Sequence, residues 1–322
     1  MARRDGAAAG CYGPGMVAVL SQVLPFFALV GLGWAAGITG FFSREATAAL
    51  TRFVFYFALS AMIFGFVVSL PMAALWDPRF VMAYLAGSFC VYLLALAAAL
   101  ARGTGAPVAA MEAQCAVVGN VGFLGIPMLV LLLGEAAAGP VMLILATDLV
   151  VFGSLVVIAV TGARDGRVSP KVLLSVGRGL LANPMIVSMV MGLAVSAAEV
   201  PIPGPVQSFL ATLGAAATPG ALFAIGCTLA HLPAERPAPA AWLTALKLGL
   251  HPLAVAVAAA WLEVDPYAAG VMVAAAALPV AGNVYILASH YGVAAGRVSA
   301  SILFSTVLAV ATVPPWIAWI GG

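Results

Sequence analysis

The stretch Gly119-Asn120-Val121-Gly122-Phe123-Leu124-Gly125-Ile126-Pro127 lies in the middle of a run that is apolar enough to cross a bilayer. Pro127 has no N–H to offer the carbonyl of Phe123, and its ring crowds that carbonyl. The three glycines lower the conformational cost of leaving helical backbone angles. We therefore expect an interrupted membrane helix. Backbone freed at membrane depth is tolerated only where protein buries it or where it lines a cavity, so the interruption predicts a site that includes Asn120.

A second stretch, Leu278-Pro279-Val280-Ala281-Gly282-Asn283-Val284-Tyr285, again combines a proline with a Gly-Asn pair in mid-span. Asn283 follows Asn120 by 163 residues (283 − 120), about half of the 322 residues. The chain is therefore predicted to contain two repeats of one unit, each with an interrupted segment, which is the best sequence pointer to the binding site of a secondary transporter. The candidate substrate-binding residues are Gly119, Asn120, Gly122, Gly125, Pro127, Pro279, Gly282, Asn283 and Tyr285.

The composition places the chain in a lipid bilayer. Hydrophobic residues make up 64% of it and charged residues 7%, whereas a soluble domain has about 25% charged residues. The apolar runs are too long and continuous for alternating barrel strands, so the predicted class is an all-α polytopic membrane protein. The formal net charge of +2 is too small, and no basic cluster is present, to suggest nucleic acid as a partner.

The sequence motifs do not indicate a metal, a cofactor or an enzyme. The cysteines form no CxxC pair and the histidines no HxxxH pair, so neither a disulfide framework nor a zinc site is expected. HExxH, GxSxG and paired aspartate-rich motifs are also missing from the sequence. The four cysteines are Cys11, Cys90, Cys115 and Cys227, and the three histidines are His231, His251 and His290.

Ten apolar runs are long enough to span a membrane. The first five belong to a first repeat, residues 16–162, and the second five to a second repeat, residues 180–322. Residues 1–15 are predicted to be a disordered tail, and Met16 is an alternative start of translation. The ten runs are Met16–Ile38, Ala48–Leu70, Phe80–Ala101, Val108–Leu133, Gly139–Gly162, Leu180–Ala198, Pro205–Leu229, Ala240–Leu262, Tyr267–Ser289 and Val298–Ile320.

The basic residues predict the orientation, because cytoplasmic loops carry an excess of Lys and Arg. Ten basic residues fall on one face and three on the other, which places the first face in the cytoplasm and both termini outside. With five helices per repeat, the two repeats then have inverted topology. The cytoplasmic set is Arg44, Arg52, Arg102, Arg164, Arg167, Lys171, Arg178, Arg236, Lys247 and Arg297, and the opposite set is Arg3, Arg4 and Arg79.

The connector between the repeats, residues 163–179, carries basic residues beside apolar ones. It is expected to be an ordinary cytoplasmic loop, with a short amphipathic helix on the membrane surface as the alternative.

Asp148 is an acid near the middle of the predicted fifth helix. Burying a carboxylate there costs at least several kcal/mol unless it is paired, protonated or hydrated. Asp148 is therefore a candidate for proton coupling, and a structural partner for a Lys or a backbone N–H is an equal alternative. Glu112 is expected to favour the N-terminal end of its helix, and Lys247 and His251 are expected to snorkel to the interface.

The two asparagines suggest the chemistry of the ligand. Asn120 and Asn283 can hydrogen-bond a carboxylate or cap an interrupted helix. Half-helix N-termini bring partial positive charge and free N–H groups to the same place, which favours an anionic group. A small organic anion is the predicted substrate.

The pattern resembles the auxin efflux carrier family, within the bile-acid, arsenite and riboflavin transporter group. The resemblance rests on five features spread over nearly the whole chain. They are the Leu24-Pro25-Phe26 run ending at Gly33, the Asn120–Pro127 segment, Asn183-Pro184, the segment from Pro279 through Tyr291-Gly292, and the closing Ser301–Pro314 helix.

The resemblance implies ten helices in two inverted repeats, with the fourth and ninth helices crossing where they unwind. It also implies an elevator-like motion of a transport unit against a scaffold, with Asn120 at the substrate site. The plant members have a proline at each crossing where this chain has Gly119 and Val284, and they have a long central loop that it lacks. These departures favour a bacterial inner-membrane carrier of small carboxylates such as malonate, malate or lactate.

Several alternatives stay open at this point. Protons or the membrane potential are expected to drive transport, and a sodium-coupled symporter of the bile-acid type is the nearest rival. A membrane sensor that binds its ligand without moving it and an intramembrane enzyme are the others. The oligomeric state is also left open, and a homodimer is one of the forms considered.

Overall fold

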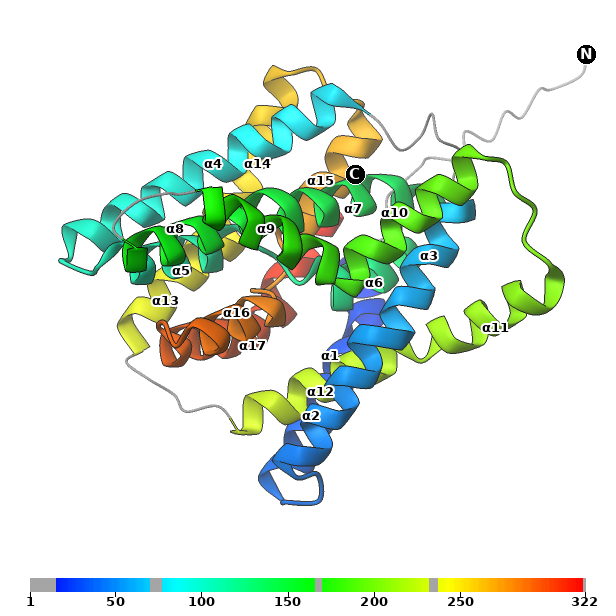
Figure 1. Ribbon diagram of the computed structural model, residues 1–322, viewed down its shortest axis with the longest axis horizontal. Coiled ribbons are helices and arrows are strands. Elements are labelled where there is room, and N and C mark those ends of the chain that lie inside the picture. The colour runs from blue at the N-terminus through cyan, green and yellow to red at the C-terminus, as the bar shows by residue number, and fades with distance from the viewer. Residues whose placement is uncertain (1–15, 70–76, 166–169, 232–236, 321–322) are drawn as a thin grey trace, which may run out of the picture.

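The structure is a computed structural model that describes residues 16–69, 77–165, 170–231 and 237–320. The predicted tail, residues 1–15, and part of the connector lie outside the described residues. Across the described ranges the chain is helical, with one isolated antiparallel bridge and no strand (Figure 1). The predicted all-α class is confirmed.

Seven helices in the described ranges are long and apolar enough to cross a membrane, and an eighth span results if one bent pair is counted. The bent pair, Val176–Ala182 and Pro184–Ala197, turns by 73°. Two shorter apolar helices, Val121–Leu133 and Pro266–Ala276, lie next to the predicted interruptions. The seven are Leu20–Ile38, Arg44–Ser69, Pro78–Ala101, Glu135–Ala163, Gly204–His231, Ala238–Trp261 and Ala295–Ile320.

The α-helices are numbered in chain order. They are α1 (Met16–Ile38), α2 (Arg44–Phe53), α3 (Leu59–Ser69), α4 (Pro78–Ala101), α5 (Ala106–Val117), α6 (Ile126–Leu133), α7 (Ala138–Thr147), α8 (Gly153–Asp165), α9 (Pro170–Ala182), α10 (Pro184–Ala197), α11 (Gly204–Ala215), α12 (Ala217–His231), α13 (Pro237–Ala245), α14 (His251–Trp261), α15 (Pro266–Ala276), α16 (Gly282–Tyr291) and α17 (Ala295–Ile320). Short π-helical segments join several of them: Val54–Ala58, Val121–Gly125, Asp148–Phe152 and Leu246–Leu250.

Side-chain caps followed by proline fix the start of several spans. The Asp77 carboxylate accepts the N–H of Arg79 at 2.9 Å ahead of α4, and Asp265 accepts the N–H of Ala268 at 3.0 Å ahead of α15. Each cap is followed directly by a proline, which needs no hydrogen bond at the first helical position. An Asn-Pro pair acts in the same way at the start of α10, where the Asn183 side chain caps the helix ahead of Pro184. The sharp turn after α9 lies at this pair.

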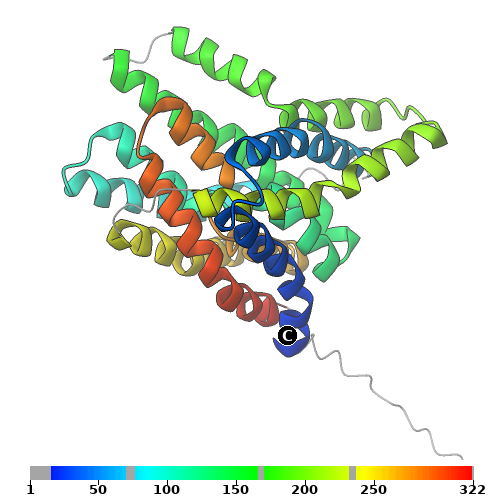
Figure 2. The same ribbon diagram turned by 90° about the horizontal axis from the view of Figure 1, so that it is seen from below.

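The helices pack as two groups. In the first group, α1 packs on α12, α12 on α2, and α3 on α10 and α11. In the second group, α4 packs on α5 and α14, α14 on α15, and α13 on α17. Figure 1 shows α3, α10 and α11 on one side of the molecule and α4, α8 and α13 on the other. The groups meet where α1 contacts α17, a pair that lies side by side in Figure 2, and where α12 contacts the segment Val121–Gly125.

Glycine allows the close approach of α1 to α12. A methyl group at Gly33 would lie 2.1 Å from the carbonyl oxygen of Phe223, and one at Gly226 would lie 2.0 Å from that of Val30. Small residues are how membrane helices bring their backbones into contact, because lipid gives little hydrophobic driving force between helices.

We predict that Gly33→Ala destabilises the protein by about 1–3 kcal/mol, because the added methyl group forces the two backbones apart. The midpoint of thermal unfolding in detergent measures this. Gly31→Ala on the same helix is the matched control, since a methyl group there meets nothing within 4 Å. Equal midpoints for the two variants would contradict the packing argument.

Candidate binding site

The two interrupted segments meet backbone to backbone. The chain leaves the helix after Val117 in the first segment and after Ala276 in the second, and Gly119 pairs with Val280 in an antiparallel bridge. The Asn120 N–H donates to the Pro279 carbonyl at 2.8 Å, and the Ala281 N–H donates to the Val118 carbonyl at 3.1 Å. Each interruption thus provides the hydrogen-bond partners that the other has lost.

Further contacts complete this backbone. The Val280 N–H donates to Ser305 Oγ of α17 at 3.0 Å. The Asn120 carbonyl accepts the N–H groups of Leu124 at 3.1 Å and Gly125 at 2.9 Å, which starts the π-helical segment. Interrupted backbone is stable at this depth because such partners replace the missing helical bonds.

The two asparagine side chains keep unused hydrogen-bonding capacity. Asn120 is 5% exposed, and its Oδ1 atom is buried without a partner in the described structure. The Oδ1 atom of Asn283 is also buried without one. Asn120 precedes the π-helical segment without a side-chain cap. Buried polar atoms normally have partners, so each of these two amide oxygens can still accept a hydrogen bond.

The glycines at the crossing are held by close neighbours. A methyl group at Gly125 would lie 2.7 Å from Leu278 Cδ1, and one at Gly122 would lie 2.7 Å from Met185 Cε. At Gly119 it would lie 3.2 Å from both the Ala275 carbonyl oxygen and Lys247 Nζ. These three glycines therefore bring second-repeat groups against the first interruption.

Lys247 and His251 are buried, and the expectation that they snorkel to the interface is wrong. Both are 0% exposed. Lys247 Nζ lies 2.5 Å from the Ala276 carbonyl oxygen and 3.2 Å from His251 Nδ1, and His251 Nε2 lies 2.9 Å from Ser88 Oγ. With Lys247 donating, Nδ1 accepts and Nε2–H donates to the serine. Without Lys247, the predicted cytoplasmic face keeps nine basic residues, against three on the opposite face.

Asp148 lies in the same buried region. It is 3% exposed, and Tyr84 donates its hydroxyl hydrogen to Oδ1 at 2.8 Å. Its Oδ2 atom is buried without a partner in the described structure. Lys247 interacts with it electrostatically. Asp148 thus has one satisfied oxygen and one that can take a proton or a ligand hydrogen.

Glu112 is the other buried acid near the crossing, and it has partners of its own. Its side chain is 1% exposed and forms ion pairs with Arg102 and with Arg297, the latter at 2.7 Å. Arg102 follows α4 and Arg297 lies in the first turn of α17, so Glu112 links the predicted first repeat to the predicted second one. This supports the structural interpretation of Glu112 and replaces the helix-dipole explanation.

Asn283 and Asp148 line one cavity of about 270 Å³, and the crossing residues Gly119 and Asn120 do not. Gln114 of α5 also lines this cavity, and its Oε1 atom is likewise buried without a partner in the described structure. The cavity lies between α5, α9 and α16.

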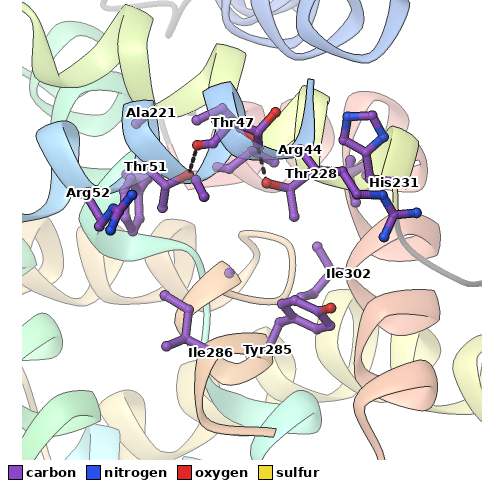
Figure 3. A pocket seen from close by; sticks show the side chains of 16 residues that line it. Arg44, Thr47, Thr51, Arg52, Ala221, Thr228, His231, Tyr285, Ile286 and Ile302 are labelled. Atoms are coloured by element: carbon purple, nitrogen blue, oxygen red, sulfur yellow. Dashed lines mark hydrogen bonds between the residues drawn. The ribbon is translucent and has the colours of Figure 1, made fainter. Parts of the chain in front are cut away.

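A larger cavity of about 590 Å³ lies between the two helix groups (Figure 3). Thr47 and Thr51 of α2 face Tyr285 and Ile286 of α16 across it, with Arg44 and Arg52 at either side. Phe123 and Gly282 connect the lining to the two interruptions. Neither arginine forms an ion pair within the described residues, so both are available to an anion.

A third cavity, of about 790 Å³, also lies between the groups but on the other side of the interruption. It is lined by α3, α6 and α11, and Pro127 is part of it. Phe123 lines the second cavity and Pro127 the third, one helical turn apart. The first interrupted segment therefore separates two large cavities.

The structure adds residues that the sequence interpretation missed: Tyr84, Ser88, Gln114, Lys247 and His251, with Arg44 and Arg52 in the larger cavity. A signal for four of them was present in the repeat spacing. Ser88 and His251 are 163 residues apart, as are Tyr84 and Lys247 (247 − 84), and this is the spacing of the two asparagines. Applying this 163-residue offset to the whole sequence pairs the helix of Tyr84 and Ser88 with the helix of Lys247 and His251. That pairing would have predicted a buried Lys247.

Comparison with known proteins identifies the family of this chain. Residues 18–317 match the family model described as membrane transport protein. The chain is 34% identical over 306 residues to a protein of Rhizobium meliloti (strain 1021) named "Putative malonate transporter", covering 92% of this chain and 94% of that protein. The chain therefore belongs to the membrane transport protein family, the auxin efflux carrier family of permeases.

Proposed function

We propose that this protein is a secondary active transporter that moves a small organic anion, a mono- or dicarboxylate such as malonate, across the bacterial inner membrane. The observation that carries the proposal is the backbone pairing of two interrupted membrane helices, Val118–Asn120 with Pro279–Ala281. Interrupted helices that meet at a repeat interface are where secondary transporters bind substrate and coupling ions.

The register of this pairing supports two inverted repeats. Val118 and Ala281 are hydrogen-bonded and 163 residues apart (281 − 118), and Ser88 and His251 contact each other at the same spacing. Equivalent residues can touch each other only at the axis that relates the two copies. With the bent pair and both interrupted segments counted as spans, the seven long helices become ten.

Charge supports an anionic substrate. The helix α16 begins at Gly282 without a side-chain cap, and Gly282 lines the cavity that also holds Arg44 and Arg52. A helix N-terminus offers partial positive charge and N–H donors to a carboxylate, and guanidinium groups bind carboxylates through paired hydrogen bonds. The relative's name adds malonate as the substrate to test first.

The two large cavities support alternating access. One lies beside Arg44 near the start of α2 and the other beside Ser69 at the end of α3. In an elevator-like motion, the second helix group would slide along the first and expose Asn120 and Asn283 to each cavity in turn. The excess of basic residues on the Arg44 side favours the cytoplasm for that side. We accordingly propose that both chain termini lie outside, with a homodimer as one form of assembly.

The test is uptake of labelled malonate, malate, lactate and auxin into proteoliposomes. Each substrate is measured with an imposed pH gradient, with a sodium gradient, with a membrane potential and with none of these. Saturable uptake of a carboxylate driven by the pH gradient or the potential is the expected result. Uptake that needs sodium would support the bile-acid-type symporter, and binding without uptake would support a sensor.

We predict that Asn120→Ala lowers uptake by about 5- to 150-fold, while the protein still inserts and folds. The lost amide would bind substrate rather than pack, and losing a buried polar contact to the substrate costs about 1–3 kcal/mol. Asn283→Ala tests the equivalent position. Thermal midpoints near that of the unmodified protein establish folding, and normal uptake by Asn120→Ala would remove this residue from the site.

We predict that Asp148→Asn uncouples uptake from the pH gradient, because the amide cannot take up and release the proton that the carboxylate carries. Uptake driven by the membrane potential should then exceed uptake driven by the pH gradient. Glu135→Gln is the matched control, since Glu135 is an exposed acid at the start of the same long helix. A pH-driven rate unchanged in Asp148→Asn would make Asp148 a structural partner.

A further inference from the structure

Lys247 lies at the point where two half-helices end. Its Nζ atom donates to the carbonyl of Ala276, the last residue of α15, at 2.5 Å. A methyl group at Gly119, two residues beyond the end of α5, would lie 3.2 Å from the same Nζ atom. The side chain is 0% exposed, so its amine reaches these two helix ends inside the protein.

The surroundings of Nζ suit a positive charge. The C-terminal end of a helix carries about half a negative elementary charge on its free carbonyls. Two such ends meet here, and the carbonyl oxygen of Ala275 lies 3.2 Å from the position of a methyl group at Gly119. In transporters with interrupted helices, such C-terminal ends and unwound carbonyls coordinate the coupling cation.

The side chains around Nζ add one negative group and one neutral acceptor. Asp148, held by Tyr84, interacts electrostatically with Lys247. His251 Nδ1, at 3.2 Å, is directed toward Nζ, and its ring is anchored through Ser88 on α4. The ammonium thus has acceptors on α15 and α14 and a carboxylate nearby, which offset part of the cost of burying it.

We propose that the Lys247 ammonium takes the place of a dissociable coupling cation at the crossing, so that this carrier needs no sodium. A cation supplied by a covalently attached side chain stays with the protein throughout the transport cycle. The two helix ends are then neutralised in every state, and no sodium gradient enters the energetics. This inference rests on the proposed transport function and adds that this transport does not depend on sodium.

The first experiment needs no substrate. The thermal midpoint of the purified full-length protein is measured in sodium chloride and in choline chloride, for the unmodified protein, Lys247→Gln and Lys171→Gln. We expect sodium to stabilise Lys247→Gln alone, because an ion that binds the folded state raises its midpoint. Lys171, the other lysine of the chain, lies in the connector between the repeats and is the matched control.

Two results would overturn the proposal. One is stabilisation of the unmodified protein by sodium relative to choline, and the other is a Lys247→Gln variant on which sodium has no effect. If the variant does not fold, the midpoints of the unmodified protein in sodium and in choline still distinguish a resident lysine cation from a sodium site. Lys247→Arg, which keeps the charge, then tests whether charge alone restores folding.

The second experiment measures uptake of the substrate found above. The unmodified protein should transport equally in sodium and in choline, and Lys247→Gln should lose about tenfold in choline and regain part of it in sodium. Sodium-dependent uptake by the unmodified protein would overturn the proposal. If no substrate is transported at all, the proposed function fails, while the thermal experiment still decides the role of Lys247.

Discussion

The pairing of Val118–Asn120 with Pro279–Ala281 is the constraint on which the rest of the structure depends. Backbone N–H and C=O groups cannot be left without partners at membrane depth, where each costs several kcal/mol. Two interruptions that face each other antiparallel satisfy this requirement together. Neither interrupted segment has these partners without the other, so the pairing forms only where the two segments meet.

That meeting point explains the placement of the charges. Asp148, Lys247 and Glu112 are all nearly or fully buried, and each has a partner from the other repeat. Tyr84 and Asp148 come from the first repeat, Lys247 and His251 from the second, and Glu112 joins Arg102 to Arg297. The Glu112–Arg297 ion pair, the Ser88–His251 contact and the Asp148–Lys247 interaction each join the first half of the chain to the second. The first group contributes the packed glycines of α1 and α12 instead.

The space between the two groups carries the positive charge that the proposed anion site requires. The cavity beside Arg44 and Arg52 combines free guanidinium groups with the start of α16, and the cavity beside Pro127 lies one helical turn away along the first interruption. A carrier needs a route from each side of the membrane to one site. The two cavities beside the first interrupted segment suit such a route in the mechanism that we propose, and family membership makes the protein a membrane transporter.

Hydropathy, glycine and proline act locally on a backbone that lipid cannot solvate. The sequence therefore sufficed to predict the all-α membrane class, most of the long apolar helices and the positions of both interruptions. It also contained the 163-residue spacing that relates the repeats. The locations of Lys247 and His251 were decided only by the tertiary structure. A basic residue near a helix end looks the same in sequence whether it reaches water or a buried helix terminus. The difference depends on the Ala276 carbonyl, on Gly119 and on Ser88, which come from other segments and become neighbours only after folding.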